Sequence, residues 1–336
     1  MKRNKLSVLG VLAAMLTFAL VLGGCKDPND QNNDEATPKL DLQSWTAVGD
    51  SKFDSDSYIY GIAYGGGKFV AVGAGGKMAY STDGISWTAV IDSKFGSSEY
   101  IYGIAYGGGK FVAVGSGSSG NMAYSTDGIS WTAVSDSKFS ISGIILGITY
   151  GGGKFVAVGG DDGSGKMTYS TDGISWTAVS NSKFDDYGII CIAYGDGKFV
   201  SVGDGGRMAH STDGTTWTAV SDSKFGLSSI NGIAYGDGKF VAGGDNGKMA
   251  YSTDGINWTA VSDSKFDSDI YGIAYGDGKF VAGGSDGKRA YSTDGTTWTA
   301  VSDSKFDGSA IFGIAYGDGK FVAVGDTGKM AYSSKE

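Results

Sequence analysis

Few of the 336 residues have side chains suited to catalysis or metal binding. His210 is the only histidine, and it stands where other copies of the same phrase have Tyr. One histidine makes neither a catalytic triad nor a zinc site. The thiol of Cys191 lies elsewhere in its repeat, so no base is at hand to activate it. We interpret both side chains as members of packed strands. We expect no catalytic residue, no metal and no cofactor.

Aspartate is abundant, so a calcium site needs consideration. The stretch GGDDGSGK at 159–166 combines two acids with several glycines. It lacks the spaced ligands and the terminal Glu of an EF-hand loop. Aspartate beside glycine is more often a turn residue. A structural calcium ion is therefore kept only as an alternative.

A repeat must position all of these residues. Its units contain one tryptophan each, at spacings of 40 to 45 residues: Trp45, Trp87, Trp131, Trp176, Trp217, Trp258 and Trp298. A period of this length is typical of repeat architectures. The first unit has four short segments rich in apolar and aromatic residues, at 60–65, 68–73, 78–81 and 87–90. Glycine clusters separate them, which predicts four strands joined by hairpin turns and excludes helices.

The strands are apolar on both faces, as in FVAV at 69–72, so both faces must be covered. A β-propeller achieves this by stacking four-stranded blades around an axis. An open solenoid would need polar end caps, and none is visible. The last unit stops after its third strand at 329–333, whereas SWTAV at 44–48 is a fourth strand without a unit. We predict an all-β, seven-bladed propeller over 44–336, closed by three C-terminal strands and the N-terminal one.

The first 43 residues differ from the repeats. Lys2, Arg3 and Lys5 precede an apolar stretch at 6–21 that ends in LGGC at 22–25. This resembles a bacterial lipoprotein signal, which implies lipidation of Cys25 and a place in the bacterial cell envelope, at the surface or in the periplasm. A transmembrane anchor is the alternative, but the stretch is short. We predict a signal peptide over 1–24 and an acidic, disordered tether over 25–43.

Charge and cysteine content limit the partners. The chain has 27 Lys and Arg against 36 Asp and Glu, a net charge of −9 at pH 7. This balance disfavours nucleic acid as a partner of the folded region. Cys191 is the only cysteine after Cys25, so no disulfide is expected within the propeller. We predict a monomer that meets the membrane through its N-terminal lipid.

The repeated STDG phrase resembles the Asp-box, or BNR repeat, of sialidase-like and sortilin-like propellers. That motif reads Ser-x-Asp-x-Gly-x-Thr-Trp and forms the turn between a blade's third and fourth strands. Ser81, Asp83, Gly84 and Trp87 match it in kind, with a loop one residue shorter. The resemblance covers 44–333 and implies structural roles, away from any active site. It implies the same roles for Asp127, Trp131, Asp172, Trp176, Asp213, Trp217, Asp254, Trp258, Asp294 and Trp298.

A sialidase-like activity is a distant alternative. Such a site needs an arginine cluster for a carboxylate, together with Tyr and Glu groups. Arg207 and Arg289 are the only arginines in the repeats, and they belong to non-adjacent units. Glu99 is the only Glu between residues 44 and 333. We therefore predict that the protein is not an enzyme.

One face of the predicted propeller varies between units. The first-to-second and third-to-fourth turns share one face and hardly change, whereas the blade connections and second-to-third turns share the other and vary. A binding surface built on loops would show this pattern, although drift in unconstrained loops gives the same one. The predicted ligand-binding face comprises Asp56, Tyr58, Glu99, Tyr100, Asp161, Asp162, Asp185, Asp186, Tyr187, Asp269 and Tyr271.

Tyrosine beside short acidic groups suits a glycan, a peptide or a protein ligand. Our main hypothesis is a membrane-anchored surface lipoprotein whose propeller is a non-enzymatic binding or scaffold module. An envelope assembly or stability factor that acts through protein–protein contacts is the first alternative. A glycoside hydrolase of sialidase-like fold is the second.

Overall fold

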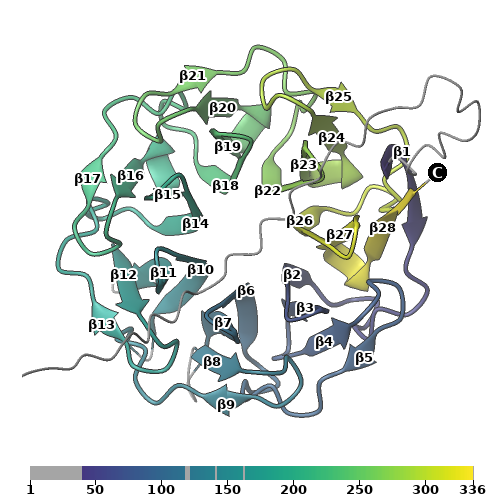
Figure 1. Ribbon diagram of the computed structural model, residues 1–336, viewed down its shortest axis with the longest axis horizontal. Coiled ribbons are helices and arrows are strands. Elements are labelled where there is room, and N and C mark those ends of the chain that lie inside the picture. The colour runs from purple at the N-terminus through teal and green to yellow at the C-terminus, as the bar shows by residue number, and fades with distance from the viewer. Residues whose placement is uncertain (1–39, 118–121, 141, 162, 336) are drawn as a thin grey trace, which may run out of the picture. The chain divides into compact units, whose positions relative to one another are not determined.

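The computed structural model describes residues 40–117, 122–140, 142–161 and 163–335. Seven antiparallel sheets of four strands each are arranged in a ring around a central axis, as Figure 1 shows. The all-β, seven-bladed propeller predicted from the sequence is confirmed. No helix in these residues is long and apolar enough to cross a membrane.

The strands of each blade follow one another in the chain from the channel outward. Blade 1 contains β2 (Ile59–Gly65), β3 (Lys68–Gly73), β4 (Met78–Ser81) and β5 (Thr88–Ala89). Blade 2 contains β6 (Tyr100–Gly107), β7 (Lys110–Ser116), β8 (Met122–Ser125) and β9 (Thr132–Ala133). Blade 3 contains β10 (Ile144–Gly151), β11 (Lys154–Asp161), β12 (Ser164–Ser170) and β13 (Thr177–Ala178). Blade 4 contains β14 (Ile189–Gly195), β15 (Lys198–Gly203), β16 (Met208–Ser211) and β17 (Thr218–Ala219).

The remaining blades repeat this order. Blade 5 contains β18 (Ile230–Gly236), β19 (Lys239–Gly244), β20 (Met249–Ser252) and β21 (Thr259–Ala260). Blade 6 contains β22 (Ile270–Gly276), β23 (Lys279–Gly284), β24 (Arg289–Ser292) and β25 (Thr299–Ala300). Blade 7 contains β26 (Ile311–Gly317), β27 (Lys320–Gly325), β28 (Met330–Lys335) and β1 (Leu40–Ala47). Short 3₁₀ turns follow the second strands of the last four blades: η1 (Asp204–Gly206), η2 (Asp245–Gly247), η3 (Ser285–Gly287) and η4 (Asp326–Gly328).

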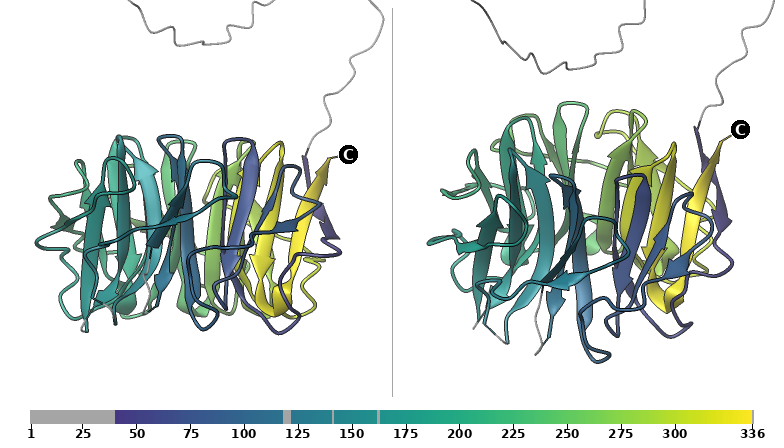
Figure 2. Two further views of the ribbon diagram at one scale, coloured as in Figure 1. Left: turned by 90° about the horizontal axis from the view of Figure 1, so that it is seen from below. Right: turned by 60° about the horizontal axis from the view of Figure 1, so that its bottom comes forward.

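The N-terminal strand completes blade 7. Its sheet has the order β1-β28-β27-β26, with β1 antiparallel to β28. Figure 2 shows the purple N-terminal strand beside the yellow C-terminal one. β1 starts at Leu40, inside the range 25–43 predicted as a tether, so that range is too long by its last four residues. The reason is that Leu40 and Leu42 are buried in a cluster with Trp45.

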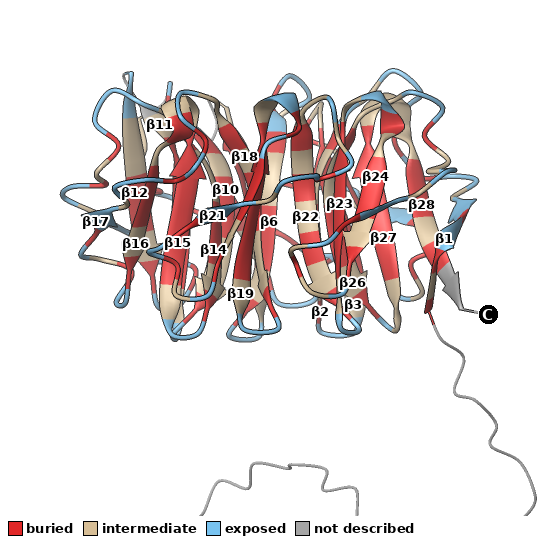
Figure 3. Cartoon of the chain, turned by 90° about the horizontal axis from the view of Figure 1, so that it is seen from above, coloured by how far each residue is buried: buried red, intermediate tan, exposed pale blue. Residues whose placement is uncertain are grey.

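The hydrophobic core lies between blades. Val70 and Met78 of blade 1 share a cluster with Ile101, Phe111 and Trp131 of blade 2, and the other clusters likewise join adjacent blades. Figure 3 shows the buried surface along the strands of the blades. Each blade therefore needs a neighbour on both sides, and ring closure leaves none without one.

One contact at the ring closure departs from the repeat. Arg289 stands where blade 5 has Met249, and its guanidinium carbon lies 3.5 Å from the centre of the Trp45 ring. The side chain is buried, and its Nε and Nη1 have no hydrogen-bond partner among the described residues. Burial lowers the pKa of Arg289 to about 9, against an opposing effect of Asp303. The Arg289 Nη2 donates to the backbone carbonyl oxygen of Asp303 at 3.3 Å, so the closing interface carries a buried cation that is only partly compensated.

Arg289→Met is expected to stabilise the propeller. The two buried donors without a partner cost about 1–3 kcal/mol each, whereas the lost cation–π contact is worth about 2 kcal/mol and the lost hydrogen bond from Nη2 to Asp303 about 1 kcal/mol. The net gain in unfolding free energy is then about 1 kcal/mol, measured by thermal denaturation. The reciprocal variant Met249→Arg places the same cation in the cluster of Trp298 and should lower the melting temperature. A less stable Arg289→Met protein would show instead that the stack on Trp45 dominates.

Candidate functional site

The first strands of the seven blades enclose a cavity of about 330 Å³ around the propeller axis. Each strand contributes the same short segment to its wall, such as Tyr60, Gly61 and Ile62 from β2. The volume is at the lower end of the range for small-ligand sites. It suits a single side chain or a small molecule rather than a folded domain.

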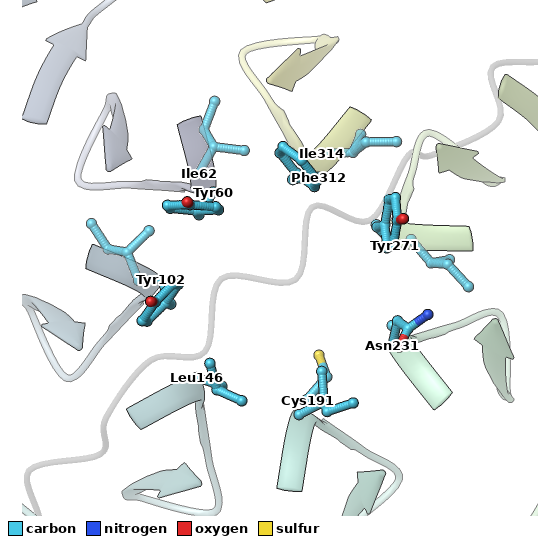
Figure 4. Close-up of a pocket in the computed structure, with 18 of the residues that line it drawn as sticks. Tyr60, Ile62, Tyr102, Leu146, Cys191, Asn231, Tyr271, Phe312 and Ile314 are labelled. Carbon is cyan, nitrogen blue, oxygen red and sulfur yellow. The ribbon is translucent and has the colours of Figure 1, made fainter. Parts of the chain in front are cut away.

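A β-bulge directs one residue of every first strand into this wall. In β2, Ile59 pairs with Gly73 and Gly61 with Val72, so Tyr60 between them has no partner residue in β3. The same interruption occurs in the other six blades. Bulges bend a strand and redirect a side chain. The seven bulged residues line the cavity, most of them labelled in Figure 4: Tyr60, Tyr102, Leu146, Ile190, Asn231, Tyr271 and Phe312.

The residue after the bulge is glycine in six blades because the first strands approach one another closely. A Cβ on Gly61 would lie 2.9 Å from the carbonyl oxygen of Tyr102 in the next blade. Blade 4 alone has a side chain here, Cys191, which lines the cavity. Burial raises the pKa of its thiol.

Aromatic side chains cover one side of the channel without a gap. The ring centres of Tyr271 and Phe312 are 5.4 Å apart, those of Phe312 and Tyr60 5.7 Å, and those of Tyr60 and Tyr102 5.1 Å. Two further rings, each two residues before the bulged residue, stack on these: Tyr58 on Tyr60 and Tyr100 on Tyr102. We call the six residues the aromatic arc: Tyr58, Tyr60, Tyr100, Tyr102, Tyr271 and Phe312. It spans blades 6, 7, 1 and 2, which are contiguous across the ring closure.

The opposite side differs in chemistry. Leu146 and Ile190 make it aliphatic, and Asn231 adds an amide. On the aromatic side, burial and then the neighbouring Tyr102 raise the pKa of Tyr60 to about 12. The Tyr60 phenol is therefore neutral at physiological pH, and the arc presents uncharged rings.

Carboxylates surround the same end of the channel. Asp204, Asp245 and Asp326 begin the turns η1, η2 and η4, and Asp269 precedes β22. We call these four the mouth acids. Two of them bond directly to residues of the cavity wall. Asn231 Nδ2 donates to Asp245 Oδ1 at 3.0 Å, and the Tyr271 hydroxyl donates to Asp269 Oδ2 at 3.4 Å.

The other hydrogen-bond partners of the mouth acids are also neutral. The Ser229 hydroxyl donates to Asp204 Oδ1 at 3.2 Å, and its backbone N–H donates to Asp245 Oδ2 at 3.0 Å. The backbone N–H of Thr327 donates to Asp326 Oδ1 at 2.6 Å. No ion pair among the described residues includes any of the four.

The basic residues of the same turns pair on the outer side instead. Lys77 pairs with Asp54, and Lys288 with Asp267. Lys329 pairs with Asp307 at 3.1 Å and Arg207 with Asp185 at 3.3 Å, all in the connections between blades. These four cations are thereby paired away from the channel, whereas Lys248, of the turn that contains Asp245, donates to the backbone carbonyl oxygen of Phe225 at 2.9 Å.

The structure brings together only part of the predicted ligand-binding face. Tyr58, Tyr100 and Tyr271 belong to the aromatic arc, and Asp269 is a mouth acid. Asp56 and Asp186 are exposed in their loops. Asp161 is the last residue of β11, and Asp162 lies outside the described residues.

Two residues predicted for this face are engaged elsewhere. Tyr187 lies two residues before its strand rather than one, and the Arg207 guanidinium covers its ring at 4.0 Å. Glu99 is 5% exposed and accepts the Gly96 N–H at 2.8 Å within its own loop. Its carboxylate therefore holds the loop and is not presented to solvent.

Sequence reasoning missed the bulged ring apart from Tyr271, and three of the four mouth acids. A signal was present. In the segment I-x-G that opens each first strand, the middle residue varies among Tyr, Leu, Ile, Asn and Phe while its neighbours hardly change. The prediction of a ligand-binding face considered only the variation in the loops.

The residues singled out for chemistry are dispersed. His210 in β16 is half-buried, and burial lowers its pKa, with a smaller effect of Lys198. No group of three or more His, Cys, Asp or Glu side chains within the described ranges could hold a metal ion. The stretch 159–166, weighed for calcium, includes Asp162 and is only partly described.

The six STDG turns share one hydrogen-bond pattern and lie outside the cavity. In blade 3, the Ser170 hydroxyl donates to Asp172 Oδ1 at 2.9 Å, and that oxygen accepts the N–H groups of Ile174 and Ser175 at 2.8 Å. Trp176 is buried behind the turn. The other five turns repeat these bonds. The aspartate thus closes the third hairpin of its blade.

No protein-family model and no curated protein sequence matches this chain. Its fold is similar to several solved structures. YCF48 from Cyanidioschyzon merolae is 17% identical at a TM-score of 0.65, over 86% of this chain and 98% of that one. YCF48 bound to D1 peptide is 19% identical at 0.66, over 89% and 99%. A catalytically inactive virginiamycin B lyase from Staphylococcus aureus with quinupristin is 12% identical at 0.67, over 87% and 99%.

These comparisons correct the prediction that the protein is not an enzyme. Virginiamycin B lyase is an enzyme on the same propeller architecture. At 12% identity the likeness shows the fold alone. The fold therefore gives no ground for excluding catalysis, and the scarcity of His, Arg and Glu was too narrow a criterion.

The STDG turns should make the protein sensitive to acid. The N–H groups of Ser175 and then Ile174 lower the pKa of Asp172 to about 2. An unfolded aspartate titrates near about 4, so the stabilisation is present above that pH and is lost as the pH falls through about 2. We expect the amide NMR signals of Ile174 and Ser175 to titrate with a midpoint near 2, and Asp172→Asn to abolish the titration. A midpoint near 4 would mean that the two hydrogen bonds are absent.

Proposed function

We propose that this propeller is a ligand-binding module whose site is the mouth of the central channel. One observation carries the proposal. The seven bulged residues converge on a single cavity, and they differ in chemistry while the frame around them repeats. A purely structural ring would favour seven similar residues, because the blades are otherwise alike. An aromatic side facing an aliphatic and amide side is what an oriented ligand needs.

A peptide segment, as part of a protein partner, is the ligand class that we favour. The cavity of about 330 Å³ accepts one side chain, and the variable loops around it add surface for the rest of the segment. A solved propeller of similar fold, YCF48, binds D1 peptide. That likeness supports a peptide ligand here, and an envelope assembly partner is one form that it would take.

We further propose that the chain is a lipoprotein of the bacterial cell envelope, with signal peptide 1–24 and lipid on Cys25. Support comes from the basic start, the apolar stretch 6–21 and the LGGC segment. Because β1 begins at Leu40, the segment after Cys25 is available as a tether between lipid and propeller. The lipid would hold the channel near partners in the same envelope.

Site-specific photocrosslinking in cells tests the binding site. Tyr58 of the aromatic arc and Ile85 of an STDG turn are 41% and 42% exposed, so they form a matched pair on different turns. Each is replaced by p-benzoylphenylalanine in the full chain. We expect a discrete crosslinked product from position 58 and none from position 85, identified by mass spectrometry. Equal products from both positions, or none from 58, would contradict the proposed site.

Cys25→Ser tests the anchor. Without the thiol no acyl chain can be attached, so radiolabelled palmitate should no longer enter the protein. The chain should move from the detergent phase to the aqueous phase in a Triton X-114 partition, because acyl burial provides about 0.8 kcal/mol per CH₂. Cys191→Ser is the matched control and should change neither result. Membrane retention of the Cys25→Ser chain would point to a transmembrane anchor instead.

A further inference from the structure

We infer that the channel mouth recognises a cationic group, the side chain of an arginine or lysine within a peptide segment. The inference rests on the proposed function and specifies the ligand for that same site. It is carried by the cavity with its aromatic arc, together with the sign of the charge around it.

The aromatic arc supplies the first half of the argument. The rings of Tyr60, Tyr102 and Phe312 line the cavity, and their centres lie 5.1 to 5.7 Å apart. The faces of aromatic rings carry negative potential and attract Lys and Arg at distances up to about 6 Å. An aromatic surface alone would also suit a sugar ring or an apolar side chain, so the arc limits the ligand without choosing it.

The negative charge at the mouth favours a cationic ligand over a sugar or an apolar side chain. Four carboxylates, from blades 4 to 7, lie beside the mouth, and their hydrogen-bond partners are hydroxyl, amide and backbone groups. Four cations of the adjacent turns pair with aspartates of the blade connections, as Lys288 does with Asp267, and Lys248 donates to the carbonyl of Phe225. A carboxylate or phosphate ligand would meet repulsion here. A cation would meet both the rings and uncompensated acids, in a concave site that strengthens the local potential.

The chain provides an example of this recognition outside the channel. Arg207 lies over the Tyr187 ring at 4.0 Å and pairs with Asp185 at 3.3 Å. The same three components, a cation, a tyrosine face and an aspartate, would be assembled at the mouth if the ligand supplied the cation. There Tyr271 already bonds to Asp269, so a ring and an acid are held together.

Peptide binding to the full, lipidated chain in detergent tests the inference. The probes are capped pentapeptides that differ only at the central residue: Arg, Lys, Gln, Leu or Glu. We expect the Arg and Lys peptides to bind at least tenfold more tightly than the Gln peptide, and the preference to weaken with added salt. We expect no binding of the Glu peptide.

Two variants separate the parts of the site. Asp245→Asn combined with Asp269→Asn keeps the shape of the mouth and removes two charges. The affinity for the Arg peptide should fall at least tenfold, and the affinity for the Leu peptide should not change. Phe312→Leu keeps an apolar side chain but removes a ring face, so the affinity for the Arg peptide should fall several-fold. Asp277→Asn combined with Asp318→Asn, on the turns between the first and second strands of blades 6 and 7, changes the net charge equally and should have no effect. Melting temperatures verify that each variant is folded.

The outcomes distinguish the two proposals. Equal binding of the Arg, Gln and Leu peptides, sensitive to Phe312→Leu, would overturn cation recognition and leave the channel mouth as a binding site. An unchanged affinity in the Asp245→Asn, Asp269→Asn variant would overturn the role of the mouth acids. If no peptide binds at millimolar concentration while photocrosslinking from position 58 succeeds, the inference fails and the proposed function stands. If both peptide binding and photocrosslinking fail, both cation recognition and the proposed binding site are contradicted.

Discussion

The close approach of the seven first strands is the constraint on which this structure depends. Six of the seven blades have glycine at the position after the bulge, and a Cβ on Gly61 would lie 2.9 Å from the carbonyl oxygen of Tyr102 in the next blade. Glycine there allows the blades to meet around a narrow channel. The bulge then directs the preceding side chain into that channel, where it contributes little to the core between blades. The glycine that close packing of the blades requires thus lies next to the bulged residue, whose identity the fold does not constrain.

Function in such a ring must come from departures from the repeat. Four contiguous blades, joined through the N-terminal strand, place aromatic residues at the bulge, while blades 3 to 5 place Leu146, Ile190 and Asn231 there. The charges are also sorted. Lysines of the second-to-third turns pair outward, and aspartates of those turns remain at the mouth. Two independent asymmetries therefore coincide at one end of one cavity, which is the reason to regard it as the site.

The architecture could be predicted because three sequence features indicate the same closed ring of blades. They are the tryptophan period, the apolar faces of the strands and the last unit split between the two ends of the chain. The site could not, because it depends on pairing register. Tyr58 and Tyr187 look alike in the sequence, yet the first stacks in the arc and the second pairs with Arg207 one residue further from its strand. Glu99 looked like a free acid, but its loop folds back onto its carboxylate. The amino-acid composition of a strand does not indicate a bulge, so the bulged residues of the channel wall could not be distinguished from core residues.

The size of the cavity limits what the channel can achieve alone. A space of about 330 Å³ admits one side chain, and a contact of that size gives modest affinity however well its charge is matched. Charge at the mouth would then act mainly on selection and on the rate of encounter. The remaining affinity must come from the variable loops beside the mouth or, under the proposed lipid anchor, from holding both partners at one membrane, which would raise their effective concentration. Specificity in the channel and affinity outside it are, on this argument, separate properties of the same face.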